Sequence, residues 1–183
     1  GVILEIEDKL KYQTHPKIGS ADAFSTSQWL AISEYANERY ISISPLVQGL
    51  GHASFILKHP MYFELRDDPK SDWAFNPRNP KTYEVQFDLY DEAFSITPYG
   101  KYLHVGGDEV KTTGRNSGQS SLELQLYWLN KVTNYAQKND RIPIFWDDMP
   151  LKEAGLMSPI YDTSISDGQV DSIWKINESK LNT

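Results

Sequence analysis

Apolar and polar residues alternate in blocks along the chain, and the spacing within the blocks switches between that of strands and that of helices. Short apolar, β-branched runs predict strands at 2–7, 40–48, 101–107 and 141–148, with a weaker one at 169–174. Apolar residues three or four positions apart predict helices at 25–39, 79–96 and 120–138, a helical turn at 53–58 and a short helix near 151–156.

Capping residues mark where the long helices begin. Two pairs have the spacing of a capping box, Ser25 with Gln28 and Ser120 with Glu123, and Asn79-Pro80 has the pattern of an N-cap followed by a first-turn proline. The side chains expected to line the core are Trp29, Ile32, Ser33 and Ala36, then Tyr83, Phe87, Tyr90 and Phe94, then Leu122, Leu126, Leu129 and Val132.

Repeated strand–helix–strand units predict parallel strands with helices outside. This pattern suits both a doubly wound open sheet and a (β/α)8 barrel, and no G-x-G-x-x-G follows the first strand to support dinucleotide binding. A barrel needs eight strands and about 250 residues. We therefore expect residues 1–183 to form one partial TIM-barrel domain, a fragment of about four to five βα units.

Acidic pairs follow three of the predicted strands: Glu7-Asp8, Asp108-Glu109 and Asp147-Asp148. Active sites of barrels lie at the carboxyl ends of the strands, so these pairs are expected at one face of the sheet. In "YLHVGGDEV" the two glycines allow the backbone to bend, which lets Asp108 and Glu109 reach one pocket. The acidic stretch "ELRDDPKSD" (64–72), in contrast, is expected to be a solvated surface.

Two carboxylates in one pocket suit acid catalysis. If Asp108 stays ionised it disfavours the ionised form of Glu109, which then donates a proton near neutral pH, as cleavage of a glycosidic bond requires. Neighbours on one strand are poorly placed to attack a sugar carbon from opposite sides. This points to a nucleophile that is not on the protein.

Composition excludes several other classes. The net charge of −7 without a Lys/Arg cluster argues against a nucleic-acid partner, and no apolar run approaches a membrane span. The absence of Cys excludes thiolate zinc sites. His52, His104, Asp108 and Glu109 are potential cation ligands, but no H-E-x-x-H spacing occurs, so we expect no metal and no cofactor.

Three motifs carry a resemblance to a known family. "HVGGDE" (104–109) resembles the H-x-G-G-D-E signature of glycoside hydrolase family 20, the β-N-acetylhexosaminidases. "PLVQGLGH" (45–52) resembles the family's preceding strand, which ends in Gly-His, and "IFWDDM" (144–149) its next strand, with a Trp and an acid two residues later. Over roughly residues 2–150 the chain looks most like the bacterial N-acetylglucosaminidase branch.

The resemblance implies removal of terminal β-linked N-acetylhexosamine, from glycans that contain N-acetylglucosamine or N-acetylgalactosamine, by a substrate-assisted retaining mechanism. Glu109 would protonate the leaving oxygen and then activate water. Asp108 would orient the 2-acetamido group, whose oxygen attacks the anomeric carbon. The further site residues implied are His52, His104, Trp146, Asp148 and Asp8.

Some of these assignments leave alternatives open. Asp147 takes the place of Asp148 if the strand register shifts by one, and Gln48 and Leu50 replace the family's usual Asp and Pro before Gly-His. A second function is a truncated, non-catalytic barrel that binds glycan or packs with a partner. An open sheet edge is expected to drive association of this chain into a dimer or higher oligomer.

Overall fold

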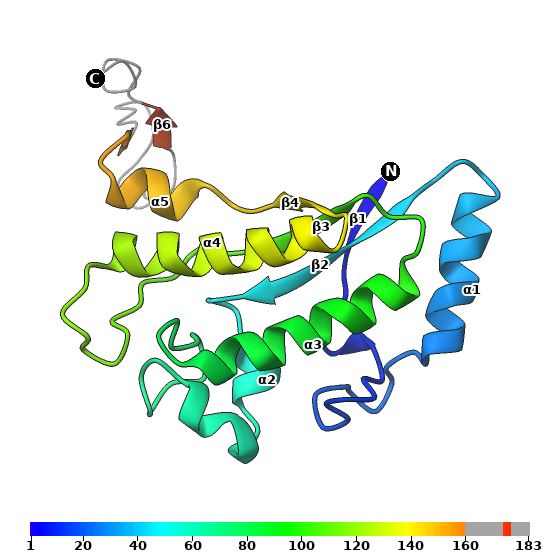
Figure 1. Ribbon diagram of the computed structural model, residues 1–183, viewed down its shortest axis with the longest axis horizontal. Coiled ribbons are helices and arrows are strands. Elements are labelled where there is room, and N and C mark those ends of the chain that lie inside the picture. The colour runs from blue at the N-terminus through cyan, green and yellow to red at the C-terminus, as the bar shows by residue number, and fades with distance from the viewer. Residues whose placement is uncertain (160–173, 177–183) are drawn as a thin grey trace, which may run out of the picture.

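The computed structural model describes residues 1–159 and 174–176. Its centre is a parallel sheet of four strands in sequential order: β1 (Val2–Glu5), β2 (Ile43–Gly49), β3 (Tyr102–Gly106) and β4 (Ile142–Ile144) (Figure 1). The long connecting helices are α1 (Thr26–Asn37), α3 (Pro80–Ile96) and α4 (Ser121–Lys138). Helix α1 packs on α3 and α3 on α4.

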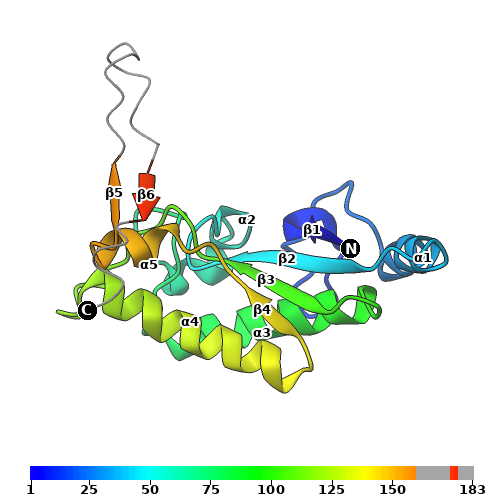
Figure 2. The ribbon, with the colours of Figure 1, turned by 90° about the horizontal axis from the view of Figure 1, so that it is seen from above.

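This order of strands distinguishes the two architectures that the sequence left open. In a doubly wound sheet the strand order reverses and helices cover both faces. Here the order does not reverse, and Figure 2 shows α3 and α4 on the same side of the strands. The prediction of a partial barrel with about four βα units is confirmed.

The shorter elements lie mainly after β2 and β4. The 3-10 helices are η1 (Glu7–Lys9) and η2 (Pro60–Leu65), and α2 (Ser54–Leu57) precedes η2. Helix α5 (Asp148–Glu153) follows β4, and β5 (Met157–Pro159) pairs antiparallel with β6 (Trp174–Ile176). Apart from Trp174, the strand predicted at 169–174 lies outside the described residues.

The predicted helix starts are confirmed. Both capping boxes form: in the second, the Glu123 amide donates to Ser120 Oγ at 3.2 Å and the Ser120 amide donates to Glu123 Oε2 at 2.8 Å. Asn79 Oδ1 accepts from the Lys81 amide at 3.0 Å, with Pro80 in the first turn. These side chains satisfy backbone donors that a helix leaves unpaired at its start.

The predicted core-facing stripes are wrong at several positions. Leu126 is 45% exposed and Ile32 is 36% exposed, and Phe87 and Phe94 are only partly buried. The largest of the fully buried side chains on α4 is Trp128, whose indole N–H donates to Gln86 Oε1 of α3 at 3.0 Å. This hydrogen bond lets an indole N–H enter the core, which a count of apolar residues misses, although Gln86 Nε2 itself has no hydrogen-bond partner in the described structure.

Strand β4 ends earlier than predicted. It covers Ile142–Ile144 instead of 141–148, because the Trp146 amide donates to the Gly106 carbonyl at 3.0 Å and the chain then turns into α5. The short helix predicted near 151–156 begins at Asp148. In the part of the chain that the structure describes, every helix is too short or too polar to cross a membrane.

Candidate active site

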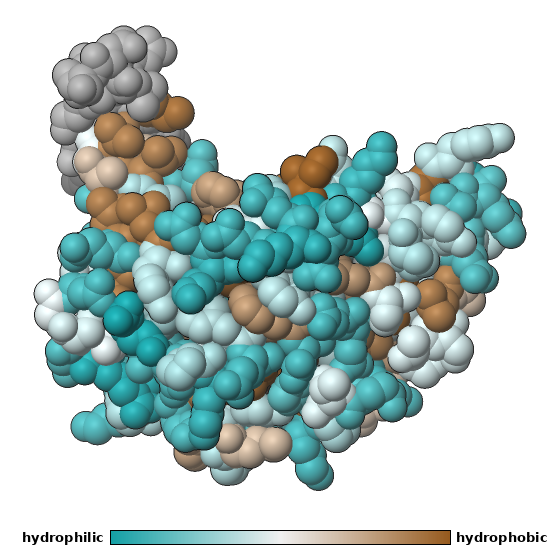
Figure 3. All heavy atoms as spheres, viewed as in Figure 1, coloured by the Kyte–Doolittle hydropathy of each residue, from teal (hydrophilic) through white to brown (hydrophobic). Residues whose placement is uncertain are grey.

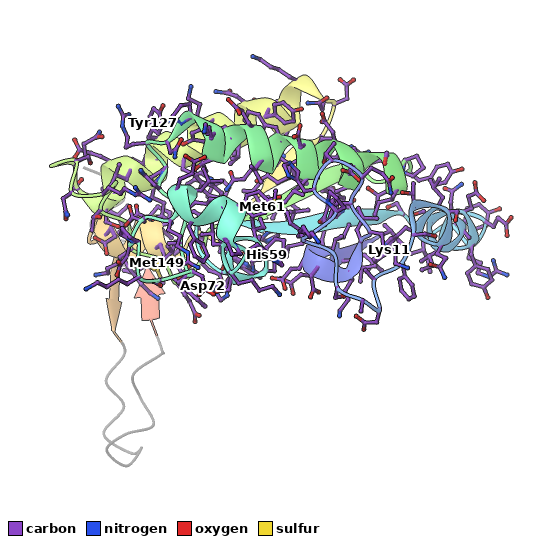
Figure 4. All side chains as sticks on the ribbon, turned by 90° about the horizontal axis from the view of Figure 1, so that it is seen from below. Lys11, His59, Met61, Asp72, Tyr127 and Met149 are labelled. Carbon is purple, nitrogen blue, oxygen red and sulfur yellow. The ribbon has the colours of Figure 1, made fainter. Side chains whose placement is uncertain are left out.

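The site lies where β2 and β3 end. Their last residues, Gly49 and Gly106, are paired in the sheet, so the loops that follow start side by side. These loops lead to His52 and to Asp108 and Glu109. In Figures 1 and 4 the loops after β2 and β3 lie at the same end of the molecule as α5, with the labelled Asp72 and Met149 at that end.

Positive φ angles bend the backbone at these strand ends. Gly106 and Gly107 have φ of 74° and 97°, and Glu109 and His52 follow with 47° and 51°. A side chain at Gly106 is disfavoured by this positive φ, and its Cβ would lie 1.9 Å from Gln48 Oε1, so the Gln48 side chain would also have to move. A hydrogen bond from α4 also stabilises the bend, because buried Gln125 donates to the Gly107 carbonyl at 2.8 Å.

His52 lies close to both carboxylates, although its buried Nε2 forms no hydrogen bond within the described residues. Its Nε2 lies 3.3 Å from Asp108 Oδ2 and 3.6 Å from Glu109 Oε2. The side chain of Asp108 is 23% exposed, whereas that of Glu109 is 72% exposed. Within the described residues, Asp108 Oδ1 is buried and has no hydrogen-bond partner. Asp108 is therefore largely buried with one unpaired acceptor oxygen, and Glu109 projects toward solvent.

A cavity of about 280 Å³ adjoins the pair, lined by Asp108, Glu109, Trp146, Asp147 and Asp148. Trp146 is 48% exposed and offers an apolar ring surface. Both aspartates after it line the cavity, so the geometry does not choose between them. Asp148 Oδ2 lies 3.3 Å from Lys152 Nζ, while Asp147 precedes α5 without forming a side-chain cap.

His104 lies behind the cavity wall. It is 5% exposed and its ring packs on that of Trp146, with the ring centres 4.8 Å apart. Its Nδ1 accepts from the Gly106 amide at 3.1 Å, which places the proton of the neutral ring on Nε2. Burial lowers the pKa of His104, and nearby Asp108 opposes this shift.

Asp8 lies apart from the residues that line the cavity. Its carboxylate is 3.6 Å from Lys9 Nζ, an ordinary surface pairing. Its neighbour Glu7 has φ of 37°, and burial together with the charges of Glu5 and Asp8 raises the pKa of Glu7, while His52 is among the groups that lower it. Of the first acidic pair, Glu7 is thus the member whose pKa is affected by the charge of His52. The role assigned to Asp8 stays a prediction.

Sequence reasoning missed the segment between η2 and α3. Asp67, in the stretch expected to be solvated, is 7% exposed, and its carboxylate accepts from the Thr113 amide at 2.8 Å and the Arg115 amide at 3.0 Å. Trp73 donates its indole N–H to the Glu109 carbonyl at 3.3 Å, and its ring lies 4.3 Å from that of His52. No motif spacing marks either residue, since the hydrogen bonds from Trp73 to Glu109 and from Thr113 to Asp67 each bridge more than 30 positions of the chain.

The three ionisable side chains after β2 and β3 also form a candidate cation site. His52, Asp108 and Glu109 offer ligand atoms within 4.8 Å of one another, the one such group found among the described residues. Neutral imidazole and carboxylates are common metal ligands. The expectation that the site works without a metal therefore stays a prediction.

Comparison with known proteins places this geometry in a family. Residues 5–181 match the glycosyl hydrolase family 20 catalytic domain. The chain belongs to this family. Among curated relatives, hexosaminidase D of Bos taurus is 28% identical over 161 residues, and a β-hexosaminidase of Porphyromonas gingivalis is 26% identical over 153 residues.

These family 20 relatives are longer. The match covers 81% of this chain but 46% of the Bos taurus protein, so the chain spans about half the length of that relative. Among solved structures, a β-N-acetylhexosaminidase of Bacteroides fragilis has a TM-score of 0.67 at 22% identity, over 80% of this chain and 34% of its own. A family 20 exo-β-N-acetylglucosaminidase of Vibrio harveyi has a TM-score of 0.65 at 18% identity, over 80% and 30%. At these identities the likeness concerns the fold.

Proposed function

We propose that the protein removes terminal β-linked N-acetylhexosamine from glycans by a substrate-assisted, retaining reaction, with Glu109 as acid and base and Asp108 orienting the 2-acetamido group. The observation that carries this proposal is the arrangement of the two carboxylates. They are consecutive residues, they approach the same nitrogen of His52, and both line the cavity that Trp146 borders. Membership of family 20 supports the substrate class.

The arrangement suits a nucleophile supplied by the substrate. In an ordinary retaining glycosidase, two carboxyl groups act from opposite sides of the sugar carbon. Asp108 and Glu109 are consecutive residues beside one histidine, so their carboxylates are poorly placed to act on C1 as an acid and a nucleophile from opposite sides. The acetamido oxygen of the substrate can then bond to C1 as the C1–O bond to the leaving group breaks.

Each carboxylate has a matching task in this scheme. Exposed Glu109 first gives its proton to the leaving oxygen. Its carboxylate then takes a proton from the water that attacks C1, and this attack opens the five-membered oxazolinium ring formed by the acetamido group. Asp108 Oδ1, buried and without a donor among the described residues, accepts from the acetamido N–H. Its negative charge balances the positive charge of the oxazolinium intermediate. The face of Trp146 provides an apolar surface for the pyranose ring.

Substrates that differ only in the 2-substituent test the proposal. The longest available form of the protein should cleave an aryl β-N-acetylglucosaminide and nearly fail on the matching β-glucoside. A thiazoline derived from N-acetylglucosamine mimics the intermediate and should inhibit far more strongly than the free sugar. Equal cleavage of the glucoside would show that the nucleophile is a protein group or water.

Leaving-group dependence separates the two roles. Glu109→Gln should slow cleavage of an unactivated disaccharide strongly and of an activated aryl glycoside less, because an activated leaving group needs little protonation. Asp108→Asn should slow both alike, since it acts on the intermediate. Unchanged disaccharide turnover in Glu109→Gln would refute the acid assignment.

A further inference from the structure

We infer that Trp73 is a positioning residue for the acid pair, which it holds through the backbone of Glu109 and the ring of His52. The inference rests on the proposed function and adds a residue from the loop between η2 and α3. Trp73 is 39% exposed, which is ordinary for a large apolar side chain of this molecule, so the inference rests on what the side chain contacts. Its contacts go to the two loops that carry the site.

Trp73 contacts each loop by a different part of its side chain. The indole N–H donates to the carbonyl of Glu109 at 3.3 Å. The ring face packs on the imidazole of His52, with centres 4.3 Å apart and planes inclined by 54°. His52 Nε2 in turn lies 3.3 Å from Asp108 Oδ2. One indole therefore restrains both the backbone of Glu109 and the histidine beside Asp108.

Glu109 needs such support. Its φ of 47° lies in the left-handed region, which costs a residue with a side chain about 1–2 kcal/mol. Its side chain is 72% exposed, so packing contributes little to hold it. A hydrogen bond to its own carbonyl restrains the residue at the position where the strain is stored.

Trp73 is itself held from both sides. The Ala53 amide donates to the Trp73 carbonyl at 3.0 Å, and Ser54 Oγ donates to Asp72 Oδ1 at 3.0 Å, which ties the segment to the loop after β2. Buried Asp67 ties the same segment to the loop after β3 through the amides of Thr113 and Arg115. A residue fixed in this way can transmit position to its partners.

The expected consequence concerns chemistry more than binding. A general acid works within about 3 Å of the atom that it protonates, and a misplacement of 1 Å can cost about a hundredfold in rate. Loss of the indole N–H should therefore give a weaker form of the Glu109→Gln behaviour. The test uses the longest available form of the protein.

Trp73→Phe keeps an aromatic ring next to His52 and removes the N–H donor together with part of the ring surface. We expect kcat on an unactivated disaccharide to fall about tenfold, the value of one hydrogen bond. On an activated aryl glycoside kcat should fall less than about threefold, and KM should stay within about twofold for both. Phe63→Leu is the control, because Phe63 is a 42% exposed aromatic of the preceding η2 and does not line the cavity.

Several results would overturn the inference. An equal loss of kcat on both substrates, a change confined to KM, or the same effect in Phe63→Leu would each contradict it. Trp73 would then either support the fold in general or contact the substrate directly. A crystal structure of Trp73→Ala gives a readout that does not depend on turnover. Glu109 should leave the left-handed region and the His52 ring should move away from Asp108. If both stay in place the inference fails, even when the proposed function holds. If the wild type cleaves no hexosaminide, the same structure still decides the positioning role.

Discussion

His104 is buried in its neutral form, and this makes stability depend on pH. Its folded-state pKa is lowered from 6.5, chiefly by burial, so below that pH the unfolded state binds more protons than the folded state. The stabilisation is fully present above about pH 6.5 and is lost as the pH falls through the lowered value. His104→Asn keeps an acceptor for the Gly106 amide and removes the titration.

The measurement is urea unfolding of the wild type and His104→Asn at pH 7.5 and 5.5. The wild type should lose more free energy of unfolding between the two pH values than the variant does. Other groups, such as Glu7, titrate in both proteins and cancel in the comparison. Equal losses would mean that His104 is protonated without cost.

At the residue scale, motif spacing identified the residues next to strand ends and missed those that reach the site across the fold. Asp108, Glu109 and Asp148 belong to acidic pairs predicted at strand ends, Trp146 was implied by the family resemblance, and all four line one cavity. Trp73 acts through a hydrogen bond to a residue 36 positions away. One sequence does not encode such a contact in any local pattern.

At the element scale, the N-terminus of α4 offers a matched pair of serines. Ser120 forms the capping box, whereas the Oγ of adjacent Ser121 is buried and has no hydrogen-bond partner in the described structure. Ser120→Ala should lower the free energy of unfolding by about 1 kcal/mol. Ser121→Ala should change it by less than about 0.5 kcal/mol. Thermal or urea unfolding measures both, and similar losses would contradict the cap assignment.

Helix boundaries were more predictable than helix faces. Capping is a local interaction between residues three positions apart, and every predicted cap forms. A buried face depends on what the rest of the fold presents. Trp128 is buried with its N–H donated to Gln86 on another helix, and Leu126, two residues earlier, lies on the exposed face.

At the scale of the whole molecule, we expect the 183-residue chain alone to be nearly inactive and to associate. Strands β1 and β4 are the outer strands of the described sheet, and each leaves one edge unpaired there. Apolar side chains are exposed at these edges, including Val2, Ile142 and Trp146. Figure 3 shows apolar surface gathered around α5. Such edges favour contact between copies.

Two measurements on the purified chain decide this. Turnover of an aryl N-acetylglucosaminide should be very low, and the mass in solution should exceed that of a 21.0 kDa monomer. Robust turnover by a monomer would contradict both expectations. The strand order was predictable because each βα unit is contiguous in sequence, whereas closure of a barrel depends on contacts between its first and last strands.

The adjacency of Asp108 and Glu109 has a mechanical consequence. Their Cα atoms are joined by a single peptide unit, about 3.8 Å long, so covalent geometry sets the spacing between the two carboxylates' attachment points. A displacement of the loop as a unit moves both Cα atoms together, and only the side-chain torsions then change the distance between the carboxylates. A pair carried on separate strands would accumulate the independent motions of two supports. The enzyme proposed here therefore has a backbone spacing between its two acids that a shift of the loop as a unit does not alter.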